Sequence, residues 1–434
     1  MLSPTADGIV IGDSVKFIFR GTIEPGTYKI YLDEEEIAPQ WQQEAYPNRW
    51  ISTIELPSRG PHVLRLESGL ENPETVKTVS FRNDLAGSMD AVDLNLSHVL
   101  NLKEPEDLAW NWTTAIFLYP LARIAEHSEH GEQYLDYVRR FHEHYMDVGT
   151  PPIDLADACP SALSAYYLAR KYDEDFAMPN VEKVIDYIKT VELNAAGSID
   201  HLGDSLESIF YPSSIWVDSL MMWVLIAVQV GMETGDQELL DRALVQPTIF
   251  AERLHDPASG LFFHAWNVEE DQLLPLGNTP WLRGNGWALV AILEVMSAVG
   301  SGHPKYSEYA STFVDIAQSI LPYRQPSGYW DTVTLQPGYA YEESSGSALV
   351  SYAFAKGARL GLLPAVYRQY AKETFAGIVA RMKKHEDGYS MEEISTATNP
   401  FNALVYKLVP RAPDRLFGNG ALLLLAEELA GESF

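Results

Sequence analysis

Residues 217–232 read VDSLMMWVLIAVQVGM, and residues 237–254 read QELLDRALVQPTIFAERL. The first stretch is apolar on every side at helical spacing, which predicts a helix that is buried all round. The second stretch places apolar residues on one face and charged residues on the other, which predicts an amphipathic outer helix. An inner helix followed by an outer helix is therefore the expected building unit of this fold.

The same alternation recurs from about residue 89 to residue 434. Inner helices, rich in small and aromatic residues, are expected at 113–126, 158–172, 217–232, 286–298, 345–360 and 420–428. More charged outer helices are expected at 134–146, 181–191, 237–254, 305–321 and 365–382, with 90–102 as the sixth. Repeated helical hairpins with loops of unequal length indicate a closed ring rather than an open solenoid. The sequence predicts a mainly α protein, with an (α/α)6 barrel as its catalytic domain at residues 89–434.

The first 88 residues follow a different pattern. Segments 14–20, 27–32, 50–56, 62–67 and 75–82 are short and alternate in polarity, with Gly, Pro and Asn clusters between them. This pattern is typical of strands in a small antiparallel β-sandwich, so we expect an accessory domain at residues 1–88. Two roles are open for this domain: carbohydrate binding, or a structural lid on the main domain.

The chain is strongly acidic, with 31 Lys and Arg against 60 Asp and Glu and a formal net charge of -29 at pH 7. Such a surface repels nucleic acid and anionic lipid, so neither nucleic acid nor a membrane is expected as a partner. It also repels polyanions at long range. An anionic substrate would therefore need local positive charge to be held.

Metal and cofactor chemistry has little support in the sequence. The single cysteine, Cys159, excludes an intrachain disulfide and a Cys-based zinc cluster. There is no His-Glu-x-x-His motif, no phosphate-cradling Gly-Lys-Ser loop and no Gly-x-Ser-x-Gly elbow. The first residues lack a basic region followed by an apolar stretch, so a cytoplasmic location is expected, or a periplasmic one if a signal peptide has been removed.

Two aspartates stand where buried helices are expected to begin. Asp157 ends the stretch IDLAD at 153–157, and Asp218 ends the stretch IWVD at 215–218. An aspartate in such a position suits a helix N-cap, and that alternative stays open for each residue taken alone. The tryptophan and apolar neighbours of Asp218 are expected to desolvate its carboxyl and raise its pKa towards the range of a general acid.

Residues 278–289, NTPWLRGNGWAL, place Arg283 between Trp281 and Trp287. The glycines are expected to allow a tight turn into a helix. The planar guanidinium suits a carboxylate, and tryptophan faces stack on sugar rings, which together predict a uronate clamp. Pairing of Arg283 with an internal aspartate is an equal alternative. For His264, the alternatives are donation to a sugar hydroxyl and burial as a satisfied core histidine.

Three motifs taken in order resemble the unsaturated rhamnogalacturonyl hydrolases and the related unsaturated glucuronyl hydrolases. They are IWVDSLMM at 215–222, WLRGNGW at 281–287, and YEESSGSA at 341–348 with AKGARLG at 355–361. The resemblance covers roughly residue 110 to the C-terminus and implies an (α/α)6 barrel without a cofactor. It also implies an oligosaccharide substrate with a terminal 4,5-unsaturated uronic acid. In this family the C4=C5 enol ether left by a polysaccharide lyase is hydrated, with a proton added to C4 and water to C5, and the hemiketal collapses to release the aglycone sugar.

Within this resemblance Asp218 stands at the position of the acid/base and Asp157 at that of the second aspartate. Residues that match the substrate-binding positions are Trp216, His264, Trp281, Arg283 and Trp287. His201 is the candidate for a family histidine upstream of the Trp-x-Asp segment. A nearby Asp157 carboxylate is expected to keep Asp218 protonated, because two adjacent negative charges are disfavoured.

Two other functions compete with this one. A conventional glucuronidase would act on saturated uronosides with two carboxylates flanking the bond. A carbohydrate-binding protein would keep the fold without the chemistry. The presence of both Asp157 and Asp218 beside tryptophans favours an enzyme, since a pure binder has no need for two costly buried carboxyls.

Overall fold

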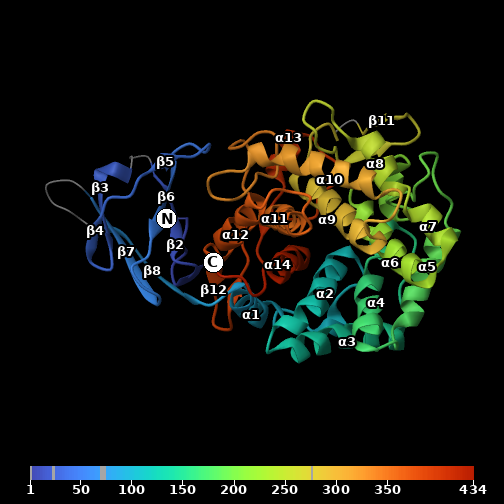
Figure 1. The fold of residues 1–434 in the computed structure, drawn as a ribbon, viewed down its shortest axis with the longest axis horizontal. Helices are drawn as coiled ribbons and strands as arrows, with labels where there is room; N and C mark the ends of the chain where they lie inside the picture. Colours follow the sequence, from blue (N-terminus) through green and yellow to red (C-terminus); the bar gives the residue numbers. More distant parts are fainter. Residues whose placement is uncertain (1, 22–24, 69–74, 275–276) are drawn as a thin grey trace.

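The computed structural model describes residues 2–21, 25–68, 75–274 and 277–434. Figure 1 shows β-strands from the first part of the chain at one end and a larger helical body at the other. The chain passes from one to the other where β8, Thr75–Leu85, leads into α1, Ser88–Val99. The protein is therefore mainly helical with strands grouped near its N-terminus.

The N-terminal strands form two sheets. They are β1 Gly8–Ile11, β2 Ser14–Arg20, β3 Tyr28–Leu32, β4 Glu35–Ile37, β5 Gln42–Gln43, β6 Arg49–Glu55, β7 Pro61–Ser68 and β8 Thr75–Leu85. One sheet has the order β1-β8-β7-β3-β4 and the other β2-β6-β5. All pairs are antiparallel except β1 with β8, which run parallel, so the expectation of a wholly antiparallel arrangement was wrong at this edge. The five expected strands all form, and the strands that were not expected are short.

The helices alternate between buried and amphipathic. Those that are buried on nearly all sides are α2 Trp112–Ile124, α4 Ser161–Tyr172, α6 Leu225–Thr234, α9 Leu282–Val299, α11 Ser344–Arg359 and α14 Leu416–Glu428. Those with an exposed face are α1 Ser88–Val99, α3 Gly131–Val148, α5 Met178–Thr190, α7 Gln237–Ala243, α8 Gln246–Leu254, α10 Tyr306–Ile320 and α12 Val366–Val379. The short helix α13, Ala403–Leu408, was not expected.

Contacts among the buried helices form a continuous series. Helix α2 packs against α4 and α14, α11 packs against α9 and α14, and α9 packs against α6. Each buried helix also packs against an amphipathic neighbour, as α3 does on α2, α10 on α9 and α12 on α11. By length and composition α9 is apolar enough to cross a membrane, but 83% of it is buried inside the fold, as expected of a core helix.

The segment after Asp218 differs from the single helix expected at 217–232. Residues Leu220–Val224 form a π-helical turn, and regular helix begins only with α6. The Asp218 carbonyl accepts hydrogen bonds from both Met221 and Met222 N–H groups. π-Helical turns are locally less favourable than α-helix and are frequent at functional sites. This turn follows directly on the candidate acid/base.

Candidate active site

A short antiparallel ladder brings Asp218 and His264 together. Strand β9, Ser214–Trp216, pairs with β10, Ala265–Asn267, so that Trp216 lies opposite Ala265. The ladder continues into the N–H of Val217, which donates to the His264 carbonyl at 2.9 Å. Residues distant in sequence are thereby fixed side by side at the point where the strands end.

The side chains of Asp218 and His264 meet at this point. Nε2 of His264 lies 3.1 Å from Oδ2 of Asp218, at ion-pair distance. On the other edge of the ring, Nδ1 of His264 lies 2.9 Å from Oη of Tyr406. That phenol oxygen accepts from the Phe401 N–H, so its proton is free to point at Nδ1. Such an arrangement holds the imidazole with Nε2–H towards Asp218.

A second carboxyl–histidine contact lies beside the first. Nε2 of His201 is 3.6 Å from Oδ1 of Asp157, and Nδ1 of His201 is 2.9 Å from Oγ of Ser219. Because Ser219 follows Asp218 in the chain, His201 links the two aspartates. The Asp157 and Asp218 side chains are 24% and 14% exposed, so a ligand can reach both.

The pKa values of the two carboxyls are displaced in opposite directions, and in the reverse sense to that expected. Burial, together with the negative charges of Asp218 and Glu207, raises the pKa of Asp157 well above its usual value. Burial acts in the same direction on Asp218, but the adjacent imidazole of His264, with smaller contributions from His201 and Arg283, outweighs it and lowers the pKa of Asp218 below its usual value. The expectation that Asp157 keeps Asp218 protonated was therefore wrong, because the groups beside Asp218 favour its charged form.

His201 contributes as a neutral ring. Burial lowers its pKa to about 4, although the charge of Asp218 acts against this shift. Its ring stacks on Trp216 with centroids 4.5 Å apart. A neutral, stacked imidazole has a defined orientation and can exchange hydrogen bonds with Asp157 and Ser219.

The tryptophans expected to bind sugar lie against the histidines. Trp216 is 5% exposed and Trp281 is 2% exposed, so neither presents an open face in this structure. The Trp281 ring stacks on His264 with centroids 4.4 Å apart, and Trp216 meets His264 edge-on at 5.5 Å. Trp287 is fully buried in the main helical core and belongs to a different packing cluster from these two rings.

Arg283 is buried and its guanidinium donates to protein groups. Nη1 donates to the Ser395 carbonyl at 3.1 Å, and Nη2 donates to the Thr396 carbonyl at 3.0 Å. The same guanidinium lies 3.9 Å from the Glu343 carboxylate, which caps the first turn of α11. Of the two alternatives, the structure shows internal pairing, with a glutamate in place of the expected aspartate.

The glycines of this motif serve helix packing rather than a turn. Residues 282–287 already belong to α9, and a Cβ atom on Gly284 would lie 2.8 Å from Cγ1 of Val217. The neighbouring Asn285 forms a paired contact with Phe262, accepting from its N–H at 2.8 Å and donating to its carbonyl at 2.9 Å. This amide holds the strand that carries His264.

Several site residues were not expected from sequence. Tyr406 lies on the unexpected helix α13, 142 positions from its partner His264, and Glu343 stands within a quoted motif without an assigned role. Neither Asp157 nor Asp218 caps a helix with its side chain: α4 begins after Pro160, and the turn after Asp218 has Ser219 at its N-cap. Among the described residues, no group of three His, Cys, Asp or Glu side chains is arranged to hold a metal ion.

Comparisons with known proteins place the helical part of the chain in a family. The model of the family described as Glycosyl Hydrolase Family 88 matches residues 90–431. The unsaturated rhamnogalacturonyl hydrolase YesR of Bacillus subtilis is 25% identical over 326 residues, covering 74% of this chain and 90% of that protein. An unsaturated 3S-rhamnoglycuronyl hydrolase of Alteromonas is 23% identical, covering 49% of this chain and 50% of that protein.

Solved structures show the same fold. A family 105 glycoside hydrolase of C. acetobutylicum superposes with a TM-score of 0.70 at 20% identity, covering 78% of this chain and 98% of that one. The unsaturated glucuronyl hydrolase of Bacillus sp. GL1 superposes with a TM-score of 0.63 at 16% identity, covering 77% of this chain and 94% of that one. With the carboxyl pair in place and the family model spanning the helical body, the chain belongs to Glycosyl Hydrolase Family 88 and is a glycoside hydrolase.

Proposed function

We propose that this enzyme removes a 4,5-unsaturated uronic acid from the non-reducing end of lyase-generated oligosaccharides by hydrating the C4=C5 enol ether. The observation that carries the proposal is the pair Asp157 and Asp218, whose pKa values are displaced in opposite directions. Hydration of an enol ether needs a neutral acid and a base at one site, and a carboxyl pair split in this way supplies both. The names of the relatives from Bacillus subtilis and Alteromonas support the same substrate class.

The protonation states suggest the order of events. Neutral Asp157 donates its proton to C4, and the electron pair of the double bond forms the new C–H bond. Water then bonds to C5 and loses a proton to the Asp218 carboxylate, so one water molecule is consumed. The product at C5 is a hemiketal, which collapses by opening the ring and releases the aglycone sugar. This division of roles differs from the acid role expected for Asp218 and follows from the histidine beside it.

The other expected binding residues fall into two groups. His264, Trp216 and Trp281 surround Asp218 and are proposed to fix the position of its carboxylate beside the uronate ring. Arg283 is proposed to hold the 395–398 segment in place rather than to bind the uronate, because both of its terminal nitrogens, Nη1 and Nη2, donate to that segment. Trp287 is proposed to support α9 from the core.

The local charges suit an anionic substrate better than the overall charge does. A protonated Asp157 carries no negative charge, and the Asp218 carboxylate lies against His264 at 3.1 Å. The site therefore repels a uronate far less than a pair of free carboxylates would. This reconciles a chain of net charge -29 with an acidic sugar.

For the architecture, we propose that residues 89–434 form an (α/α)6 barrel and residues 1–88 an accessory β-sandwich domain. The alternation of buried and amphipathic helices, with contacts that pass from α4 through α2, α14, α11 and α9 to α6, supports the barrel. Two sheets with separate strand orders support the sandwich. The family match, which begins at residue 90, supports the boundary.

A conventional glucuronidase is the second candidate, because an acid and a carboxylate of opposite protonation also serve direct glycosidic hydrolysis. Ultraviolet absorbance of the conjugated double bond separates the two. Unsaturated disaccharides are generated from several polysaccharides by lyases. Each is then incubated with the purified enzyme in the presence of a chelator. Loss of absorbance is expected with at least one of them. Release of uronic acid from saturated uronosides without any loss of absorbance would overturn the proposal.

Matched variants show whether the proposed residues carry the reaction. Asp218→Asn is expected to lower kcat by at least about a hundredfold, the typical contribution of a general acid or base. Asp204→Asn, an exposed change in the loop after His201, is expected to keep wild-type kcat. If Asp218→Asn retained full activity, the assignment of Asp218 would be wrong.

A further inference from the structure

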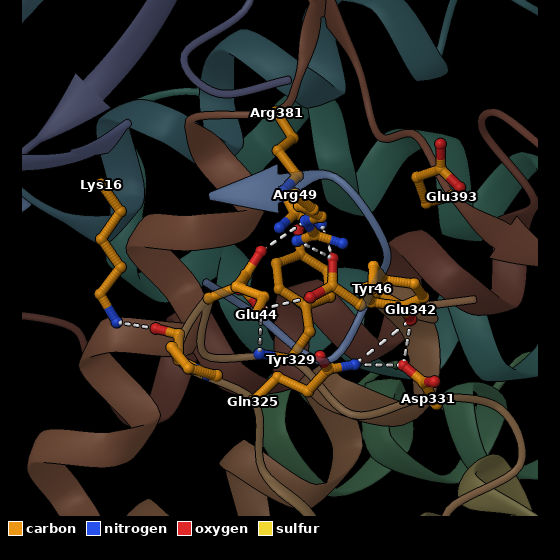
Figure 2. Close-up of polar contacts among 12 residues, drawn as sticks. Lys16, Glu44, Tyr46, Arg49, Gln325, Tyr329, Asp331, Glu342, Arg381 and Glu393 are labelled. Carbon is orange, nitrogen blue, oxygen red and sulfur yellow. Dashed lines mark hydrogen bonds and ion pairs between the residues drawn. The ribbon is translucent and has the colours of Figure 1, made fainter. Parts of the chain in front are cut away.

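We infer that the N-terminal β-domain positions the active site. Its residues 44–49, called the clamp below, hold residues 325–342 in place, and that second segment packs against Trp281. This inference rests on the proposed function for its kinetic readout, and on the contacts of Figure 2 for its geometry. It assigns the domain a role in catalysis through contact with the barrel, rather than in carbohydrate binding.

The first contact joins Tyr46 to Asp331. The Tyr46 hydroxyl donates to Oδ1 of Asp331, and Nε2 of Gln325 donates to both, lying 3.2 Å from the phenol oxygen (Figure 2). The other oxygen of Asp331 accepts from the Gly338 N–H at 2.7 Å. One carboxylate thus ties the β-domain to both ends of the loop 331–338.

The second contact is a buried ion cluster. Arg49 lies 2.5 Å from Glu44 and 2.7 Å from Glu342, and Arg381 pairs with the same Glu342 carboxylate (Figure 2). The side chains of Arg49, Glu44 and Glu342 are 7%, 0% and 4% exposed. Removing one partner from such a cluster leaves an uncompensated buried charge, so the cluster strongly favours the docked arrangement.

The backbones of the two segments also lie close together, at Gly338 and Ala45. Gly338 has a φ of +82°, and a Cβ atom there would lie 2.6 Å from the carbonyl oxygen of Ala45. Only glycine allows this approach without displacing one of the two loops. On the adjacent side, Lys16 Nζ donates to the Pro326 carbonyl at 2.7 Å and lies 3.5 Å from Glu373. The β-domain therefore contacts residues 325–342 near both ends and in the middle.

Residues 332 and 333 of the segment held by the clamp contact residues 281 and 282, and Trp281 lies beside His264. The Thr332 carbonyl accepts from the Leu282 N–H at 3.2 Å, and Val333 pairs with Trp281 in a β-bridge. Trp281, Val333 and Tyr406 share one apolar cluster, and both aromatic rings contact His264. A shift of residues 331–338 would displace the two groups that orient His264 towards Asp218.

A parallel feature of the β-domain supplies a matched control. The Arg49 guanidinium lies 4.7 Å from the Tyr46 ring, and the Arg65 guanidinium lies 4.3 Å from the Tyr31 ring. Arg65 pairs with Glu34 and Glu67 of its own domain. The same substitutions in the two pairs therefore alter an arginine–tyrosine contact that is made with and without contact to residues 325–342.

The test compares Tyr46→Phe and Arg49→Gln with Tyr31→Phe and Arg65→Gln in the full chain. Amide hydrogen exchange of peptides covering 281–283 and 331–343 is measured, together with kcat and KM on an unsaturated disaccharide. The clamp variants are expected to exchange faster in both peptides and to lose about tenfold in kcat with little change in KM, as misplacement of catalytic groups does. The control variants are expected to match wild type.

Wild-type exchange in both peptides for a folded Tyr46→Phe and Arg49→Gln would overturn the inference. If Arg49→Gln fails to fold, the milder Tyr46→Phe decides, and Arg49→Lys is expected to recover part of the loss. Faster exchange with unchanged kcat would also overturn it, because the clamp would then be structural only. If wild type does not act on any unsaturated disaccharide, the proposed function fails, while the exchange comparison still decides whether the clamp orders the Trp281 segment.

Discussion

Nε2 of His264 lies 3.1 Å from Oδ2 of Asp218, and this contact distinguishes the surroundings of the two site carboxyls. The imidazole favours the charged form of Asp218, and the negative charge of Asp218 adds to burial in disfavouring the charged form of Asp157. In the proposed mechanism this difference makes Asp218 the base and Asp157 the acid.

The pH dependence of kcat should follow from these opposite shifts. The proposed mechanism requires Asp157 to be protonated and Asp218 to be ionised. Because the pKa of Asp157 is raised, kcat should fall as pH rises through that value, and because the pKa of Asp218 is lowered, the acid limb should lie below the usual aspartate range. A pH profile measured by absorbance checks this. A profile whose alkaline limb persists in an active Asp157→Asn variant would contradict the assignment.

Tyr406→Phe should lower kcat by about tenfold, because the phenol that orients His264 would lose its hydrogen bond to Nδ1. The protein should remain folded, since the ring and its packing against Trp281 are kept. Tyr134→Phe serves as the control: it removes a hydroxyl that donates to Asp93 on outer helices, and should leave kcat unchanged. Equal kcat in the two variants would show that His264 needs no such support.

Arg283→Met should cost about 3–5 kcal/mol of unfolding free energy, because it leaves Glu343 and the carbonyls of Ser395 and Thr396 without their buried cation. Urea unfolding followed by tryptophan fluorescence measures this. If Arg283 instead bound the uronate carboxylate, Arg283→Met would show a large rise in KM with little change in stability. Arg170→Met, at a half-exposed ion pair on α4, should change stability by less than about 1 kcal/mol.

Acid should destabilise the protein through Glu294. Burial would raise the pKa of this carboxyl, but Lys356, Arg123 and Tyr352 outweigh it and lower its pKa to about 2. The stabilisation is complete above the unfolded value of 4.5 and is lost as pH falls from there to about 2, on the order of 3 kcal/mol in all.

Unfolding free energies at pH 6, 4 and 3 check the contribution of Glu294. Glu294→Gln should be less stable than wild type at pH 6, because Lys356 and Arg123 lose their buried counter-charge. The difference should shrink towards pH 3. Glu238→Gln, an exposed change on α7, should keep the wild-type dependence on pH. A constant difference at all three pH values would contradict the assignment.

Local pattern was enough to predict most elements. Strands β2, β3, β6, β7 and β8 lie within three residues of the expected segments, because alternation between two faces is a strong signal. The buried and amphipathic helices were predicted from apolar residues at helical spacing, although the single outer helix expected at 237–254 was wrong, since that segment forms two helices, α7 and α8. The parallel pairing of β1 with β8 was missed, since a four-residue strand carries too little pattern to indicate its partner. The π-helical turn after Asp218 was missed because its residues are as apolar as those of α6.

The sequence by itself predicted the alternation of inner and outer helices and the N-terminal strands, because each depends on residues close together in the chain, and its motifs singled out the two aspartates. Tertiary structure alone decided the opposite directions in which the pKa values of Asp157 and Asp218 are displaced, because the pKa of a buried carboxyl depends on charges brought beside it by folding. It also decided that Arg283 pairs with Glu343, that Tyr406 contacts His264, and that Tyr46 of the segment 44–49 donates to Asp331. These partners lie tens to hundreds of residues apart, and no local pattern records the distances between their atoms.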